Sequence, residues 1–108
     1  MVDVADRLAN LFQDRDLRDF SRHWRVRELS LFGSVLREDF GPQSDVDVLI
    51  SFDEDAPWSL WDLTTIQDEL SALIGRPVDL VEREGLRNPF RRQSILSTRK
   101  IIYVGEER

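Results

Sequence analysis

Apolar residues recur along the chain with two different spacings, which divide it into helices and strands. Val4, Leu8, Leu11 and Phe12 follow a spacing of i, i+4, i+7 and i+8, so they share one face of a helix. Other stretches are short and alternate between apolar and polar residues, as strands do. The predicted elements are a helix over 3–22, a strand over 26–32, a short helix over 34–37, a strand over 44–52, a helix over 60–74, a strand over 77–82, a helix beginning after 88 and a strand over 101–104.

The two later helices carry residues that are typical of helix ends. Ser59 followed by Asp62 is a capping-box pattern, in which each residue satisfies a backbone N–H of the other. Gly75 and then Pro77 predict the end of the same helix, because Gly suits the C-cap and Pro cannot continue a helix. The pair Asn88–Pro89 predicts the next helix start, with Asn as the cap and Pro at the first position.

Length and composition indicate one compact domain with an acidic surface. The chain has 108 residues, of which 41% are hydrophobic, enough for a single domain over residues 1–108. Its net charge is −6 and its pI is about 4.7. Binding to nucleic acid needs a basic face that neutralises phosphates, so no nucleic-acid partner is expected. An acidic chain fits a basic protein partner, or a site that holds cations.

The absence of certain residues excludes several kinds of chemistry and location. There is no cysteine, which excludes disulfides, cysteine-ligated zinc and thiol catalysis. The first residues include Asp3, Asp6 and Arg7 without an apolar stretch, so no signal peptide is expected. No apolar run reaches the ~18 residues of a membrane helix. We therefore expect a cytoplasmic protein without a membrane partner.

Two aspartates open the most apolar strand of the chain. Asp45 and Asp47 lie two residues apart, so on a strand they share one face, about 6.5 Å apart along it. Two like charges in this arrangement repel each other, and a divalent cation would remove the repulsion. Mg²⁺ binds one or two carboxylates together with phosphate oxygens and water. Asp79 on the strand 77–82 can join them if the two strands are neighbours.

Gly33 and Ser34 follow the preceding strand and could supply a phosphate site. Gly permits a tight turn and close approach of the backbone, and the Ser hydroxyl with nearby N–H groups can hold phosphate oxygens. Taken singly, Gly-Ser is an ordinary turn and Asp-x-Asp an ordinary solvated strand edge. Their combination, with ten residues between Ser34 and Asp45, is more specific.

Gly-Ser, ten residues and Asp-x-Asp together resemble the signature of the nucleotidyltransferase superfamily related to DNA polymerase beta. The similarity is greatest to its smallest members, the minimal nucleotidyltransferases. These resemble antitoxins whose partner is a helical HEPN-type ribonuclease toxin. The similar segments, besides the signature, are Arg27-Glu28-Leu29, Ser34-Val35-Leu36-Arg37, Pro57-Trp58-Ser59-Leu60 and Gly75-Arg76-Pro77-Val78-Asp79-Leu80-Val81.

The resemblance implies an α/β fold, with a small mixed sheet and helices packed largely on one face, in a single domain. It implies transfer of AMP from ATP, dependent on Mg²⁺, to a tyrosine hydroxyl of a HEPN-type toxin that forms a hetero-oligomer with this chain. The metal ligands and catalytic residues would be Asp45, Asp47 and Asp79. The nucleotide-binding residues would be Gly33, Ser34, Arg37 and Ser44, where Arg37 is either a contact to the triphosphate or a solvated helix residue.

Two other functions stay open at this point. The chain could neutralise a toxin by binding alone, without catalysis, or it could transfer nucleotides to a small molecule. If the acceptor is a protein, we expect it to dock over Trp58 and Trp61, whose alternative roles are core packing and stacking on a base. The basic residues that follow Asn88 form either a solvated face, a docking patch or a contact to substrate phosphate; they are Arg91, Arg92, Arg99 and Lys100. The single histidine, His23, has no predicted catalytic role.

Overall fold

The computed structural model describes residues 14–36 and 45–105. Its elements follow the predicted order closely. They are α2 (Asp14–His23), β1 (Val26–Phe32), the 3-10 helix η1 (Gly33–Leu36), β2 (Val46–Phe52), α3 (Leu60–Ile74), β3 (Val78–Glu82), the 3-10 helix η2 (Arg83–Gly85), α4 (Pro89–Thr98) and β4 (Lys100–Val104). The first part of the predicted helix, residues 3–13, lies outside the described residues.

The four strands form one mixed sheet in the order β3-β2-β1-β4. Strand β1 is antiparallel to both of its neighbours, β2 and β4, whereas β2 and β3 are parallel. Parallel neighbours need a crossover connection, usually a helix, and α3 supplies it. The register aligns Asp47 of β2 with Asp79 of β3. The predicted mixed sheet is confirmed.

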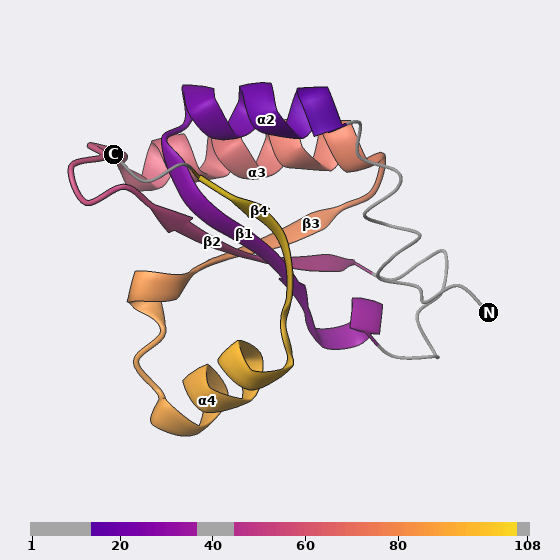
Figure 1. Ribbon diagram of the computed structural model, residues 1–108, viewed down its shortest axis with the longest axis vertical. Coiled ribbons are helices and arrows are strands. Elements are labelled where there is room, and N and C mark those ends of the chain that lie inside the picture. The colour runs from indigo at the N-terminus through magenta and orange to yellow at the C-terminus, as the bar shows by residue number, and fades with distance from the viewer. Residues whose placement is uncertain (1–13, 37–44, 106–108) are drawn as a thin grey trace.

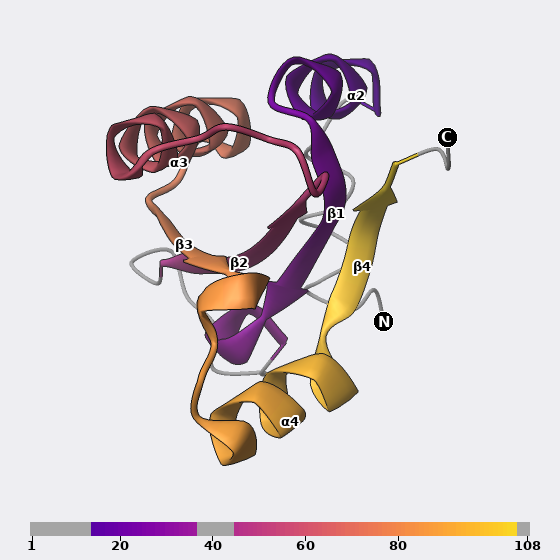
Figure 2. The ribbon, with the colours of Figure 1, turned by 90° about the vertical axis from the view of Figure 1, so that its left-hand side faces the viewer.

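Two of the three described helices lie over one face of the sheet. Figures 1 and 2 show α2 and α3 side by side on one face and α4 on the other. The larger hydrophobic core lies between the sheet and the helix pair. Its buried residues come from α2, α3, the strands, η1 and the turn after α2; they are Leu17, Phe20, Trp24, Val26, Leu29, Leu31, Val35, Val46, Val48, Ile50, Phe52, Ile66, Leu70, Ile74 and Val78. The prediction that helices pack largely on one face is confirmed.

A second, smaller core lies on the face that α4 covers. It contains Phe32, Leu49, Leu86 and Ile95, all of them buried. Leu49 is 2% exposed on this face, so most of β2 is buried on both of its faces. Burial on both faces follows from α4, which reaches this face from far along the chain. Only the beginning of β2, around Asp47, is left partly open.

Helix α3 protects the outer edge of the sheet. The Ser71 hydroxyl accepts a hydrogen bond from the backbone N–H of Val78 at 3.1 Å, and the Gln67 side-chain oxygen accepts one from Leu80 N–H at 3.1 Å. An edge strand otherwise presents unpaired N–H groups to other chains. These two contacts therefore fix β3, and with it Asp79, against the helix.

Both predicted ends of α3 are confirmed. Ser59 and Asp62 form a capping box, in which the Ser59 N–H donates to the Asp62 carboxylate at 2.9 Å. Gly75 is the C-cap, with φ of 77° in the left-handed region. Asn88 likewise caps α4, with Pro89 at its first position. Among the described residues, no helix is long and apolar enough to cross a membrane.

Trp58 belongs to the larger core and is committed to packing. Its indole N–H donates to the Trp24 carbonyl at 2.7 Å, and the two indole rings meet edge to face with centroids 5.0 Å apart. The Trp24 indole N–H donates in turn to the Glu69 carboxylate at 2.6 Å. Trp61 is different, since it is 84% exposed at the start of α3. Of the roles considered for Trp58, core packing is therefore the observed one.

The substitution Ser59→Ala should lower the free energy of unfolding by about 1 kcal/mol, because α3 loses its reciprocal cap. For a domain of this size the midpoint of thermal unfolding should fall by about 4–8 °C. Circular dichroism during heating measures both. Ser94→Ala is the control, since Ser94 is exposed within α4 and Ala favours helix there. Equal losses in both variants would show that the cap contributes nothing particular.

Candidate active site

Asp47 and Asp79 lie opposite each other on neighbouring parallel strands. Side chains of aligned residues on adjacent strands point to the same face of the sheet, and the strands are about 4.8 Å apart. Asp47 is half-buried and Asp79 exposed. Asp79 can join the other carboxylates only if its strand lies beside the strand 44–52, and that adjacency is confirmed.

Asp45 lies just before β2, so the alternation of the strand does not fix the direction of its side chain. The next residue, Val46, donates its N–H to the Pro77 carbonyl at 2.9 Å. This hydrogen bond holds the first residue of β2 against the residue that precedes β3. Within residues 14–36 and 45–105, no three His, Cys, Asp or Glu side chains are grouped closely enough to hold a metal ion. The pair formed by Asp47 and Asp79 is thus the part of the predicted triad that the strand register brings together.

Gly33 brings the Gly-Ser part of the signature into contact with the Asp-x-Asp part. It directly follows β1, whose last residue, Phe32, pairs with Asp47. Gly33 has φ of 72°, in the left-handed region, where a Cβ costs roughly 1–2 kcal/mol. A Cβ at this position would also overlap the Asp47 Oδ2 and lie 3.3 Å from its Cγ. The backbone therefore touches the carboxylate directly, and two independent constraints require glycine.

The other predicted nucleotide-binding residues are described only in part. Ser34 is the second residue of η1 and directly follows Gly33. Arg37 and Ser44 lie outside the described residues. Contacts of Ser34, Arg37 and Ser44 with a nucleotide stay predictions.

The residues present fit a magnesium ion bound together with a phosphate. Mg²⁺ prefers near-octahedral oxygen ligands and usually takes one or two carboxylates, with water and substrate phosphate filling the other positions. Asp47 and Asp79 supply two carboxylates on one face, and Asp45 is two residues from Asp47. The Asp47 carboxylate lies directly against the Gly33 backbone, and glycine permits such a close approach. The donor set is therefore oxygen-only, as hard cations require.

A cavity of about 260 Å³ exists elsewhere, between α3 and β3, and it is lined by Leu60, Leu63, Thr64, Gln67, Leu80 and Glu82. Leu80 and Glu82 alternate with Asp79 along β3, so they point to the opposite face of the sheet. Burial raises the pKa of the Glu82 carboxyl, and the nearby charge of Glu84 raises it further. This cavity is thus separate from the carboxylate pair.

Glu28 has a role that the sequence analysis did not identify. Its half-buried carboxylate accepts hydrogen bonds from Arg83 at 3.4 Å and from Arg99 at 3.3 Å. These arginines flank α4 in the sequence, so one carboxylate fastens both ends of the segment that carries this helix. The available signal was the alternation of β1, which places Glu28 on the same face as Phe32.

Comparison with known proteins identifies relatives that are nucleotidyltransferases, in agreement with the geometry of the site. The nucleotidyltransferase domain family matches residues 15–102 of the chain. A proposed protein adenylyltransferase of Methanocaldococcus jannaschii is 36% identical over 81 residues, which cover 75% of this chain and 79% of the relative. Protein adenylyltransferase MntA of Thermococcus cleftensis is 33% identical over 87 residues, covering 81% and 83% of the two chains.

Solved structures agree with these relatives. A structure described as that of a proposed minimal nucleotidyltransferase matches with a TM-score of 0.68 at 26% identity, over 92% of this chain and 95% of the other. A toxin–antitoxin structure with AMP-PNP has a TM-score of 0.61 at 18% identity, over 88% and 76% of the chains, which is a likeness of fold. Since the family match extends over most of its length, the chain belongs to the nucleotidyltransferase domain family.

Proposed function

We propose that this nucleotidyltransferase transfers AMP from ATP to a hydroxyl of a partner protein, namely a tyrosine of a HEPN-type toxin. The observation that carries the proposal is the alignment of Asp47 with Asp79, with the Gly33 backbone against Asp47. Two further findings support it: relatives are named protein adenylyltransferases, and a similar fold occurs in a toxin–antitoxin structure with AMP-PNP.

In this mechanism the chain positions the nucleotide and prepares the acceptor. Asp47 and Asp79, with Asp45, would hold Mg²⁺, which stabilises charge on the phosphates. Gly33 and Ser34 place the triphosphate beside them. The acceptor oxygen forms a bond to the α-phosphorus while the bond from that phosphorus to the bridging oxygen of the β-phosphate breaks. Pyrophosphate leaves, and the hydroxyl proton passes to Asp79, which acts as the general base.

Transfer to a partner is tested by mixing the protein with ATP, Mg²⁺ and a small helical toxin of the HEPN type. Mass spectrometry should show the partner with added AMP. Asp47→Asn should slow the transfer by about 100-fold or more, because loss of several kcal/mol of charge stabilisation has that effect. Asp68→Asn is the control, since Asp68 is exposed on α3, and it should transfer normally.

Two results would contradict this function. A partner that stays unmodified but is neutralised equally by the protein and by Asp47→Asn would show that binding alone is sufficient. Transfer of AMP to aminoglycoside-type small molecules, with none to the partner, would show that the acceptor class is wrong.

Gly33→Ala should reduce transfer by about 100-fold, because displacement of Asp47 by about 1 Å has an effect of that size on a positioned reaction. Gly75→Ala is the matched control. Gly75 also has a positive φ, of 77°, but nothing lies within 4 Å of the added Cβ. Both variants should lose roughly 1–2 kcal/mol of stability, measured by urea denaturation, while only Gly33→Ala loses transfer. Equal activity of the two variants would exclude the contact with Asp47 from the mechanism.

A further inference from the structure

We propose that the exposed first turn of α4 is the docking surface for the acceptor protein, and that it recognises an acidic segment with an apolar side chain. We call Phe90, Arg91 and Arg92 the α4 surface. The proposal rests on the proposed function, since it identifies where the acceptor of that reaction binds.

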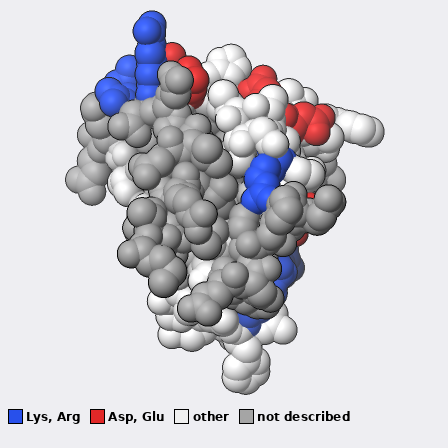
Figure 3. Space-filling model, turned by 90° about the vertical axis from the view of Figure 1, so that its right-hand side faces the viewer, with Lys and Arg blue, Asp and Glu red and all other residues white. Residues whose placement is uncertain are grey.

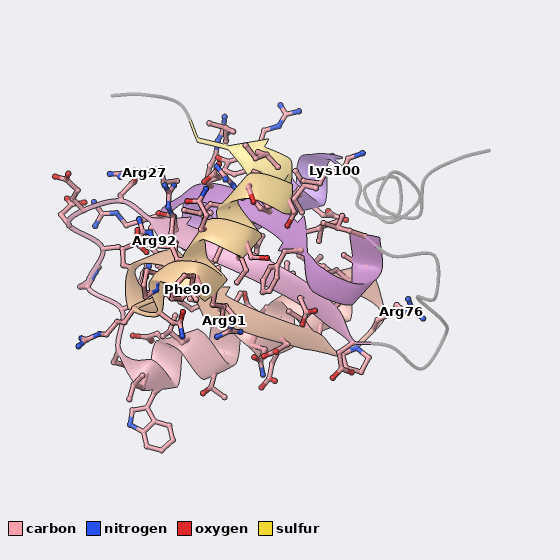
Figure 4. The ribbon with its side chains drawn as sticks, turned by 90° about the horizontal axis from the view of Figure 1, so that it is seen from below. Arg27, Arg76, Phe90, Arg91, Arg92 and Lys100 are labelled. Carbon is pink, nitrogen blue, oxygen red and sulfur yellow. The ribbon has the colours of Figure 1, made fainter. Side chains whose placement is uncertain are left out.

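Asp47, Asp79 and α4 lie on the same face of the sheet, whereas α2 and α3 cover the other (Figure 2). Helix α4 packs through Ile95 against Leu49, which is two residues beyond Asp47. An acceptor hydroxyl must therefore approach the carboxylates from the side on which α4 lies. Figure 4, seen from below, shows α4 in front of the sheet, with Phe90, Arg91 and Arg92 on the opposite side of the view from Arg76, so an acceptor bound there must extend along this face to reach the carboxylates.

Helix α4 presents these side chains from a fixed backbone. The Asn88 side chain accepts hydrogen bonds from the N–H groups of Phe90 and Arg91, at 3.0 and 3.1 Å. Glu28 fastens the segment at both ends, through Arg83 and Arg99. An ordered turn loses little conformational entropy when a partner binds, which favours affinity.

Stability of the fold does not explain the residues of the α4 surface. Phe90 is 85% exposed, so it contributes little to the core. Arg91 and Arg92 lie near the helix N-terminus, where positive charge opposes the helix dipole, and no acidic residue lies in the first turn. Within the described residues neither arginine makes an ion pair. Aromatic residues and arginine are the types enriched in protein interfaces.

Charge indicates what kind of partner fits. Residues 83–100 contain six basic residues and one acidic residue, although the whole chain has a net charge of −6. Figure 3 shows acidic side chains mainly in the upper part of the view, with basic side chains among them, and basic side chains along the lower right. Complementary charge steers partners and suppresses wrong ones. An acidic protein segment is thus favoured.

A nucleic-acid strand is a weaker fit to the same surface. Phosphate backbones are bound through many basic contacts, and the α4 surface offers two arginines, with Asp47 and Asp79 on the same face. The earlier expectation of docking over Trp58 and Trp61 is also less favourable. Trp58 is engaged with Trp24, and Trp61 belongs to the helix layer opposite the carboxylates.

Two synthetic tyrosine peptides of equal length test the proposal. One carries Glu and Leu around the Tyr, and the other has Lys in place of each Glu. Fluorescence anisotropy measures their binding to the full chain with Mg²⁺ and AMP-PNP. The protein should bind the acidic peptide about tenfold more tightly, as two exposed charge pairs allow. R91E/R92E should remove this preference, and Phe90→Ala should weaken binding of both peptides.

R18E/R22E is the matched control, because Arg18 and Arg22 are exposed on α2, over the other face. It has the same change in charge and should retain the preference. Loss of folding is not expected for R91E/R92E, since Glu near a helix N-terminus is favourable, and circular dichroism checks this.

The outcomes separate the docking surface from the proposed reaction. Equal binding of both peptides, or the same loss of preference in R18E/R22E, would overturn the proposal. Binding of oligouridylate that exceeds binding of the acidic peptide and is lost in R91E/R92E would also overturn it. Charge-dependent binding without AMP transfer would support the docking surface and contradict the reaction. AMP transfer to both peptides at equal rates would support the reaction and contradict the docking surface.

Discussion

The contact between the Gly33 backbone and the Asp47 carboxylate is the constraint on which the site depends. It holds the end of β1 against the beginning of β2, at the pair formed by Phe32 and Asp47. The hydrogen-bonded register of these antiparallel strands fixes the contact, since a slip of one residue would turn Asp47 into the larger core. Helix α3 then returns the chain so that β3 lies parallel to β2 and Asp79 is aligned with Asp47.

The two faces of the sheet differ: one is covered by the larger hydrophobic core, and the other carries the aligned carboxylates. The larger core and the helix pair α2 and α3 occupy one face, where the apolar residues of β2 are buried. On the other face the smaller core contains Leu49, which lies two residues after Asp47 on β2. The carboxylates and this hydrophobic cluster are therefore neighbours on the same face of the sheet. Like charges at this place reduce stability unless a cation binds, and the buried second face offsets this. The same arrangement places α4 over the face of the sheet that carries the site.

Local chemistry predicted most of the fold, whereas contacts distant in sequence did not follow from it. Ser59, Gly75 and Asn88 are found at the helix ends where their capping chemistry placed them. Alternation predicted that Asp79 faces away from the larger core. Burial of Leu49 could not be predicted, because α4, which covers it, lies some forty residues later in the chain. The left-handed φ of Gly33 could likewise not be predicted, because the spacing of residues in the sequence does not specify a backbone angle. The parts of the site at Arg37 and Ser44 stay predictions.

The position of a bound cation tests the account most directly, and Mn²⁺ can be used to locate it because Mn²⁺ takes oxygen ligands as Mg²⁺ does. In NMR spectra of the protein with ATP, small additions of Mn²⁺ should broaden the backbone amide signals of Gly33, Asp47 and Asp79 first. The signals of α3 should broaden later, since α3 lies beyond the sheet, and Asp79→Asn should weaken the effect. Broadening that begins in the acidic turn 53–55, or around Glu82 in the cavity beside α3, would contradict a metal–nucleotide site at the aligned aspartates.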